Sequence, residues 1–182
     1  MIIEDSDILE KFRNEETRHA AFTLLLKKYQ QKLYWHIRRI VIEHEDADDV
    51  VQDVFIKVWK NLDSFRNDSQ LYTWLYRIAT NESITFLNKK KSKFNVSFED
   101  LSEKLADSLN DDNYFSGDEI QKKLQKALLT LPEKQRLVFN MKYYDDLKFQ
   151  EISDILGTSV GALKASYHLA VKKIEHYLLS TD

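Results

Sequence analysis

The chain of 182 residues has no cysteine, one proline and three glycines. Without cysteine, disulfides, thiolate metal sites and cysteine nucleophiles are excluded, and the composition suits a reducing compartment. Glycine and proline are also too scarce for the many tight turns that β-sandwiches and barrels need. The sequence therefore predicts an all-α fold.

Long apolar segments are also missing. No apolar run approaches the roughly 20 residues that span a bilayer, and the acidic N-terminus is unlike a signal peptide. Hydrophobic residues make up 43% of the chain and charged residues 31%, which is enough for a core under a solvated surface. We expect a folded, cytoplasmic protein with no membrane insertion.

The net charge of −3 conceals an alternation along the chain. Residues 20–91 and residues 120–182 are mildly basic, whereas residues 92–119 contain 2 basic and 8 acidic side chains. We expect two small helical domains, 1–91 and 120–182, joined by an acidic linker at 92–119. The linker has a short apolar periodicity at Leu101, Leu105 and Leu109 that indicates one weak helix. It either shields the basic domains from phosphate or is a solvated spacer.

Two amphipathic helices are predicted at residues 20–42 and 43–62. The first buries Phe22, Leu25, Leu26, Tyr29, Leu33, Ile37, Ile40 and Val41. The second buries Val50, Val51, Val54, Phe55, Val58 and Leu62. Its other face carries Asp49, Gln52, Asp53, Ile56 and Lys60, with Trp59 near the edge. An exposed isoleucine and a tryptophan beside paired acids favour a partner surface, although a solvated face is the alternative.

A third helix is predicted at residues 71–91. Leu75, Ile78, Ala79 and Phe86 or Leu87 can pack inward. A second stripe holds Trp74, Arg77, Asn81, Thr85 and Asn88, followed by Lys89, Lys90 and Lys91. Aromatic rings stack on bases, amides read base edges and lysines contact phosphate, so this stripe suits single-stranded nucleic acid. Alternatively, the lysines only stabilise the C-terminal end of the helix, where the helix dipole is negative.

Three further helices are predicted between residues 131 and 178, with Pro132 in the first turn of the first. Gly157 can end the second helix and Ser159 can cap the third. Two helices joined by a tight glycine turn are typical of a helix-turn-helix, although three-helix units that bind no DNA look alike. The third helix buries Val160, Leu163, Tyr167, Ala170, Val171, Ile174 and Leu178. Its outward face offers Ser159, Gly161, Ala162, Lys164, Ala165, Ser166, His168, Lys172 and Lys173.

The segment DADDVVQDVFIKVWKNL (46–62), followed by SFRNDSQLYTWLYRIATNESITFL (64–87), resembles the sigma-two domain of extracytoplasmic-function (group IV, sigma-70 family) RNA polymerase sigma factors. LPEKQRLVFNMKYYDDLKFQEISDILGTSVGALKASYHLAVKKI (131–174) resembles their sigma-four domain. Both segments stand in the family's order. The resemblance implies a transcription initiation factor with no enzymatic activity and no cofactor. The partners that it implies for this protein are core RNA polymerase and promoter DNA, with an anti-sigma factor as a candidate third.

The resemblance also implies roles for particular positions. Core polymerase would be bound by Asp49, Gln52, Asp53, Ile56 and Trp59. The minus-ten element would be held, as melted strand, by Phe65, Arg66, Asn67, Trp74, Arg77, Asn81, Lys89, Lys90 and Lys91. The minus-thirty-five element would be read, as duplex, by the outward residues of the helix that Ser159 caps. Many members carry arginines where this chain has Ser166, Leu169 and Val171, so the family's promoter sequence does not transfer.

Three alternatives compete with this interpretation. A stand-alone helix-turn-helix regulator that binds an operator as a dimer would explain residues 131–178 but leaves residues 46–87 without a role. A helical adaptor would need no nucleic acid. His36 and His44, with nearby acids, suggest a metal site, but the Glu-x-x-His spacing of helical di-metal proteins is absent, and no glycine loop supports nucleotide hydrolysis.

Overall fold

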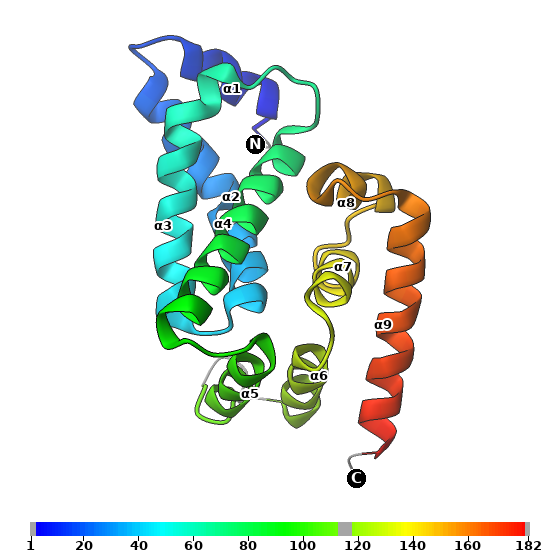
Figure 1. The fold of residues 1–182 in the computed structure, drawn as a ribbon. Coiled ribbons are helices and arrows are strands. Elements are labelled where there is room, and N and C mark those ends of the chain that lie inside the picture. Colours follow the sequence, from blue (N-terminus) through cyan, green and yellow to red (C-terminus); the bar gives the residue numbers. More distant parts are fainter. Residues whose placement is uncertain (1–2, 113–117, 181–182) are drawn as a thin grey trace. The chain divides into compact units, whose positions relative to one another are not determined.

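The computed structural model describes residues 3–112 and 118–180, and all regular secondary structure in these ranges is helical (Figure 1). The expected all-α fold is confirmed. The helices are α1 (Asp5–Arg13), α2 (Arg18–Val41), α3 (His44–Asn61), the 3-10 helix η1 (Leu62–Ser64), α4 (Leu71–Phe94), α5 (Phe98–Ser108), α6 (Glu119–Leu129), α7 (Glu133–Tyr143), α8 (Phe149–Leu156) and α9 (Val160–Ser180). Among them, no helix is both long and apolar enough to cross a bilayer.

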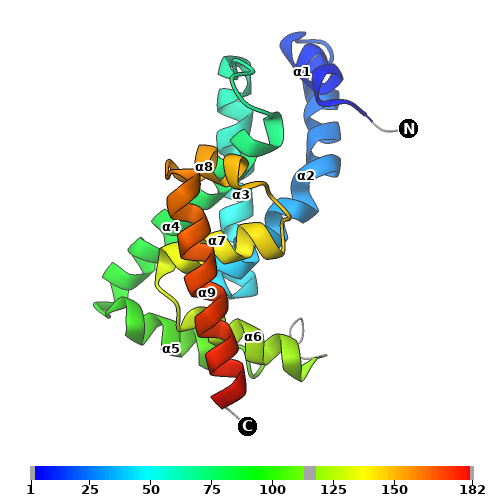
Figure 2. The ribbon, with the colours of Figure 1, turned by 90° about the vertical axis from the view of Figure 1, so that its right-hand side faces the viewer.

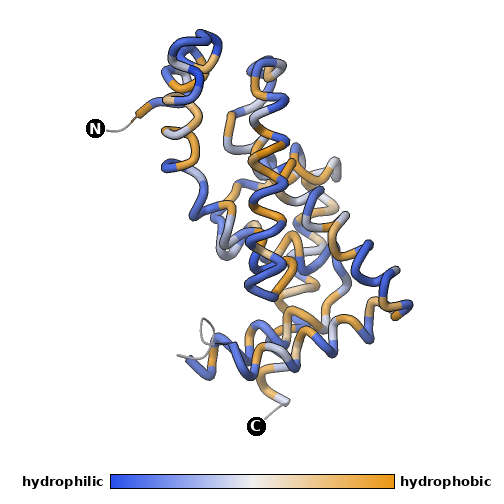
Figure 3. Tube along the Cα trace, turned by 90° about the vertical axis from the view of Figure 1, so that its left-hand side faces the viewer, coloured by the Kyte–Doolittle hydropathy of each residue, from blue (hydrophilic) through white to orange (hydrophobic). Residues whose placement is uncertain are grey.

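The chain forms two compact units, Met1–Ile84 and Thr85–Asp182. The division falls inside α4, and it places the acidic segment with the second unit. Part of that segment, residues 113–117, lies outside the described residues. The functional boundaries at 91 and 119 stay a prediction. Along the helices of Figure 3, hydrophobic and hydrophilic residues alternate, as expected when one side of each helix packs inward.

In the first unit, α1 and α3 pack against α2. Leu25, Leu33 and Ile37 of α2 and Val54 and Val58 of α3 are fully buried, which confirms these parts of the predicted stripes. The side chain of His36 links α2 to α4, since its Nε2 lies 2.8 Å from the Thr80 hydroxyl. Thr80 donates its one proton to the Tyr76 carbonyl, so Nε2 of His36 must be the donor in this contact.

The sequence did not reveal α1. Its apolar stripe, formed by Ile8, Leu9 and Phe12, is buried. The stripe predicted for residues 20–42 was also partly wrong. Phe22 and Leu26 are only partly buried, because α3 covers the neighbouring side of α2 and leaves these two side chains at its edge.

In the second unit, the expected linker helix exists as α5 and packs against α6. Leu101, Leu105 and the following Leu109 are buried. Ser97 begins α5 with a capping box in which its hydroxyl accepts from the Asp100 amide. Hydrogen bonds from Ser97 lower the pKa of the Asp100 carboxyl, so the cap weakens when that group is protonated at low pH. The ring of Phe98 lies 5.2 Å from the Arg136 guanidinium carbon, and burial lowers the pKa of Arg136 to about 10.

The predicted helix-turn-helix is present as α8 and α9, which meet at a tight turn (Figure 2). Gly157 ends α8 in the left-handed conformation, with φ of 66°. The Ser159 hydroxyl accepts from the Ala162 amide at 3.3 Å and caps α9. Leu163, Ala170 and Ile174 are buried as expected. Four other residues expected to be buried, Val160, Tyr167, Val171 and Leu178, are only partly covered, because α6, α7 and α8 do not enclose α9 completely.

Candidate functional sites

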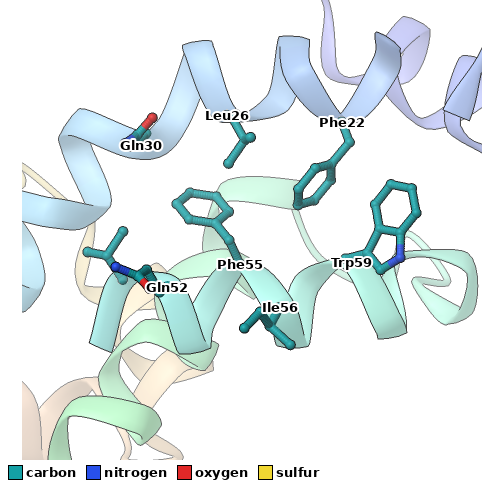
Figure 4. A pocket seen from close by; sticks show the side chains of 8 residues that line it. Phe22, Leu26, Gln30, Gln52, Phe55, Ile56 and Trp59 are labelled. Carbon is teal, nitrogen blue, oxygen red and sulfur yellow. The ribbon is translucent and has the colours of Figure 1, made fainter. Parts of the chain in front are cut away.

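An apolar groove of about 480 Å³ runs between α2 and α3 in the first unit (Figure 4). It is lined by Phe22, Leu26 and Gln30 of α2 and by Val51, Gln52, Phe55, Ile56 and Trp59 of α3. Phe22 and Trp59 lie at one end of the groove, and Gln30 and Gln52 lie at the other. The groove therefore has an aromatic end, an apolar middle formed by Leu26, Phe55 and Ile56, and an amide end.

The five side chains expected to bind a protein partner lie on α3. Three of them, Gln52, Ile56 and Trp59, line the groove. Asp49 and Asp53 are exposed on the same face of the helix, one turn apart, and add negative charge beside it. Ile56 is 52% exposed, which is unusual for such an apolar side chain. Apolar groups rimmed by acids are typical of a protein-docking surface.

Sequence reasoning missed the α2 wall of this groove. Phe22 and Leu26 were assigned to the core, and Gln30 was assigned no role. The periodicity of α2 identifies its apolar side, but it does not tell which part of that side another helix covers. Phe22 contacts both Phe55 and Trp59, with ring centroids 6.3 and 5.0 Å away, so one aromatic surface continues across the two helices.

The loop between η1 and α4 holds the first three candidate minus-ten residues. Phe65 is only 6% exposed and packs on Trp74, with ring centroids 5.3 Å apart. Arg66 and Asn67 are exposed, and Asn67 adopts a positive φ of 59°. The structure thus turns Phe65 inward and presents the polar residues of the loop.

The remaining candidate minus-ten residues lie along α4. Trp74 and Arg77 are partly buried and Asn81 is exposed. Lys89 is exposed, whereas Lys90 and Lys91 are partly buried in the segment of α4 that belongs to the second unit. Spacing of three or four residues places Trp74, Arg77 and Asn81 on one side of the helix.

The candidate minus-thirty-five residues lie on the surface of α9. Ser166 is partly buried, and the other eight, from Ser159 to Lys173, are exposed. The exposed side chains of the first turns are small besides Lys164, so another backbone can approach α9 closely there. The Lys164 amine lies 6.0 Å from the centre of the Phe149 ring of α8. Within the described ranges, no group of three or more histidine and acidic residues could hold a metal ion.

Comparison with known proteins identifies two regions of one family in the chain. Sigma-70 region 2 matches residues 25–93, and sigma-70 region 4 matches residues 121–174. The first match contains α3 and most of α4, and the second contains the helix-turn-helix. Both matches occur in the order predicted from the sequence.

Curated relatives match over most of their length. The chain is 33% identical to the ECF RNA polymerase sigma factor SigW of Bacillus subtilis, over 81% of this chain and 83% of SigW. It is 31% identical to the ECF RNA polymerase sigma-E factor of Escherichia coli, over 94% of this chain and 93% of the relative. The chain belongs to the ECF sigma factors of the sigma-70 family, which are transcription initiation factors rather than enzymes.

Two solved structures share the fold. One is the sigma factor RpoE in complex with the anti-sigma factor NepR from Bartonella quintana, with a TM-score of 0.68, 21% identity, and coverage of 88% of this chain and 98% of RpoE. The other is CnrH in complex with the cytosolic domain of CnrY, with a TM-score of 0.70, 23% identity, and coverage of 98% of this chain and 100% of CnrH.

Proposed function

We propose that the protein binds core RNA polymerase through the groove between α2 and α3 and directs it to promoters with two recognised elements. The minus-ten element is bound as melted strand by the loop after η1 and by α4. The minus-thirty-five element is bound as duplex by α9. The observation that carries this proposal is the presence on one chain of an acid-rimmed apolar groove and, in a separate unit, an exposed helix-turn-helix.

The groove supports polymerase docking by its chemistry. A partner helix with apolar side chains would cover Ile56 and the aromatic end, and its basic residues would face Asp49 and Asp53. Apolar burial supplies most of the affinity in such an interface, while the peripheral charges mainly set the association rate and the choice of partner.

Promoter opening follows from differential binding. Separated strands cost free energy, and a protein that binds an unstacked strand better than duplex shifts the equilibrium towards the open state. Asn81 can hydrogen-bond to base edges, and Arg77 and Lys89 can meet phosphates. Phe65 supports this surface from within, because its buried ring holds Trp74 in place.

Duplex recognition is assigned to α9. The small residues Gly161, Ala162 and Ala165 permit a close approach to a major groove, where Lys164 can reach guanine acceptors. Lys172 and Lys173 lie further along the helix and suit phosphate contacts. The helix α9 has no arginine for bidentate guanine contacts, so we expect the upstream element to differ from those of arginine-rich relatives.

An anti-sigma factor is proposed as a further partner. The support is that RpoE and CnrH, which share the fold, were both solved with protein partners, in RpoE's case a named anti-sigma factor.

Binding to polymerase would also place the protein in the cytoplasm.

Fragment selection from genomic DNA tests the proposal against a stand-alone regulator. The immobilised protein is offered genomic fragments with and without core polymerase, and the retained fragments are sequenced. Defined fragments should be enriched only when polymerase is present. Equal enrichment of palindromic fragments without polymerase would contradict the proposal and favour a dimeric regulator.

A further inference from the structure

The N-terminal helix α1 lies outside the segment that matches sigma-70 region 2, which begins at residue 25. Its last turn nevertheless reaches the groove. The buried ring of Phe12 meets Trp59 edge-on, with centroids 5.3 Å apart and an interplanar angle of 86°. Phe22 meets the same indole at 5.0 Å and 80°. The His19 ring also packs on this indole, with centroids 5.0 Å apart and an interplanar angle of 32°. Trp59, which lies at the aromatic end of the groove in Figure 4, is thus held by three rings.

Arg18, the first residue of α2, closes this cluster from outside. Its Nε donates to the Phe12 carbonyl oxygen at 3.1 Å, and its Nη2 pairs with Asp63 of η1. Its guanidinium carbon lies 4.7 Å from the centre of the Phe12 ring and 6.0 Å from that of Trp59. One side chain therefore joins α1, α2 and η1 around the indole.

The other end of α1 is fixed independently. The Asp5 carboxylate accepts hydrogen bonds from the Tyr29 hydroxyl at 2.8 Å and from the Lys28 amine at 2.7 Å. Burial, helped by the Asp5 contact, raises the pKa of the Tyr29 phenol, so this hydroxyl remains a donor at neutral pH. Loss of the Arg18 contacts should accordingly loosen the last turn of α1 and the Trp59 ring, while α1 stays attached at Asp5.

We propose that Arg18 is a positioning residue for polymerase docking, which holds Phe12 and Trp59 in the arrangement that receives the partner. This inference rests on the proposed function. A surface that is ordered before binding loses less side-chain entropy when the partner docks. A Trp59 ring that is already held in its bound position therefore favours a tighter complex. The arginine itself is only partly exposed, and it acts through Trp59 rather than as the principal contact.

Fluorine NMR separates positioning from general stability. The three tryptophans are labelled with 5-fluorotryptophan, and the Trp59 resonance is assigned by its absence in Trp59→Phe. Arg18→Gln should shift or broaden this resonance alone and weaken core polymerase binding about 3- to 10-fold, the range expected when stacked cation contacts are lost. Asp63→Asn, which frees the Arg18 side chain from its ion pair, should act in the same direction.

Arg13→Gln is the matched control, because Arg13 is exposed at the end of α1 and the substitution removes the same charge. It should leave both the Trp59 resonance and the affinity unchanged. In a Trp59→Ala background, Arg18→Gln should cause no further loss of affinity.

The outcomes distinguish this inference from the proposed function. If Trp59→Ala binds polymerase as tightly as the wild type, docking through the groove is wrong, and the inference fails with it. If Trp59→Ala weakens binding but Arg18→Gln leaves the resonance or the affinity unchanged, only the role of Arg18 is refuted. Equal weakening by Arg18→Gln and Arg13→Gln would also refute it, since charge alone would then explain the effect.

Discussion

Replacing Ile56 by alanine should weaken polymerase binding without affecting the fold. Full burial of an isoleucine side chain is worth about 1.5–3 kcal/mol. Ile56 is already about half covered in the free protein, with 52% exposed. The part left for a partner to cover is therefore worth about 1 kcal/mol, which corresponds to roughly a fivefold increase in Kd. Ile56→Asp should raise Kd more than tenfold, because it adds an unpaired carboxylate to a surface that becomes buried, at a cost of about 2 kcal/mol or more.

Affinity is measured by fluorescence anisotropy of labelled protein titrated with core polymerase, and stability by thermal melting. Leu179→Ala is the matched control, since Leu179 is an aliphatic side chain on α9 that is 80% exposed and lies outside the groove. The melting temperature of Leu179→Ala should stay close to that of the wild type. The Ile56 variants should melt only about 2–4 °C lower, because the covered half of the side chain is worth about 1 kcal/mol. If Ile56→Ala and Leu179→Ala both bind as the wild type does, the assignment of the groove is refuted.

Four further variants test other parts of the structure. Asp49→Lys combined with Asp53→Lys should slow polymerase association in stopped-flow measurements, and an unchanged rate would remove the acids from the interface. Asn81→Ala should slow promoter opening, followed by a fluorescent base, more than it weakens core binding. Lys164→Ala should lower promoter affinity only when the minus-thirty-five element is present. An equal loss of affinity on templates that lack this element would contradict a contact between Lys164 and its bases. Gly157→Ala should destabilise the protein by about 1 kcal/mol in urea unfolding.

The glycine variant has an internal control in Gly161. A Cβ at either glycine would meet no atom within 4 Å, so neither substitution creates a clash. Gly157 has a φ of +66°, where an L-residue is strained, whereas Gly161 lies in α9. Gly161→Ala should therefore stabilise the fold by about 0.5–1 kcal/mol. Changes of the same sign in both variants would refute the conformational explanation.

The fold was predictable where apolar periodicity is long. The helices around Leu33, Val54 and Leu163 follow from spacing alone, and Gly157 and Ser159 mark the turn between α8 and α9 by their backbone and capping chemistry. The helix α1 escaped prediction because nine residues with three buried apolar side chains in an acidic region resemble a polar tail. The helix α6 has a readable periodicity at Leu124, Ala127 and Leu128, which are buried.

The candidate sites were predictable to a different degree. The exposed position of Ile56 on α3 followed from the helical period. The burial of Phe65 and the partial exposure of Phe22 did not, because both depend on which neighbouring helix covers them. A sequence pattern identifies an apolar side chain, but tertiary packing decides whether that side chain belongs to the core or to a docking surface.

Run-off transcription with reconstituted polymerase tests the central claim most directly. Core enzyme, genomic fragments and the protein are combined, and the transcripts are mapped to their start sites. Discrete transcripts should require the protein and should be lost with Ile56→Asp. If the protein forms no stable complex with core polymerase, or if no start site depends on it, its assignment as a promoter-directing factor is contradicted.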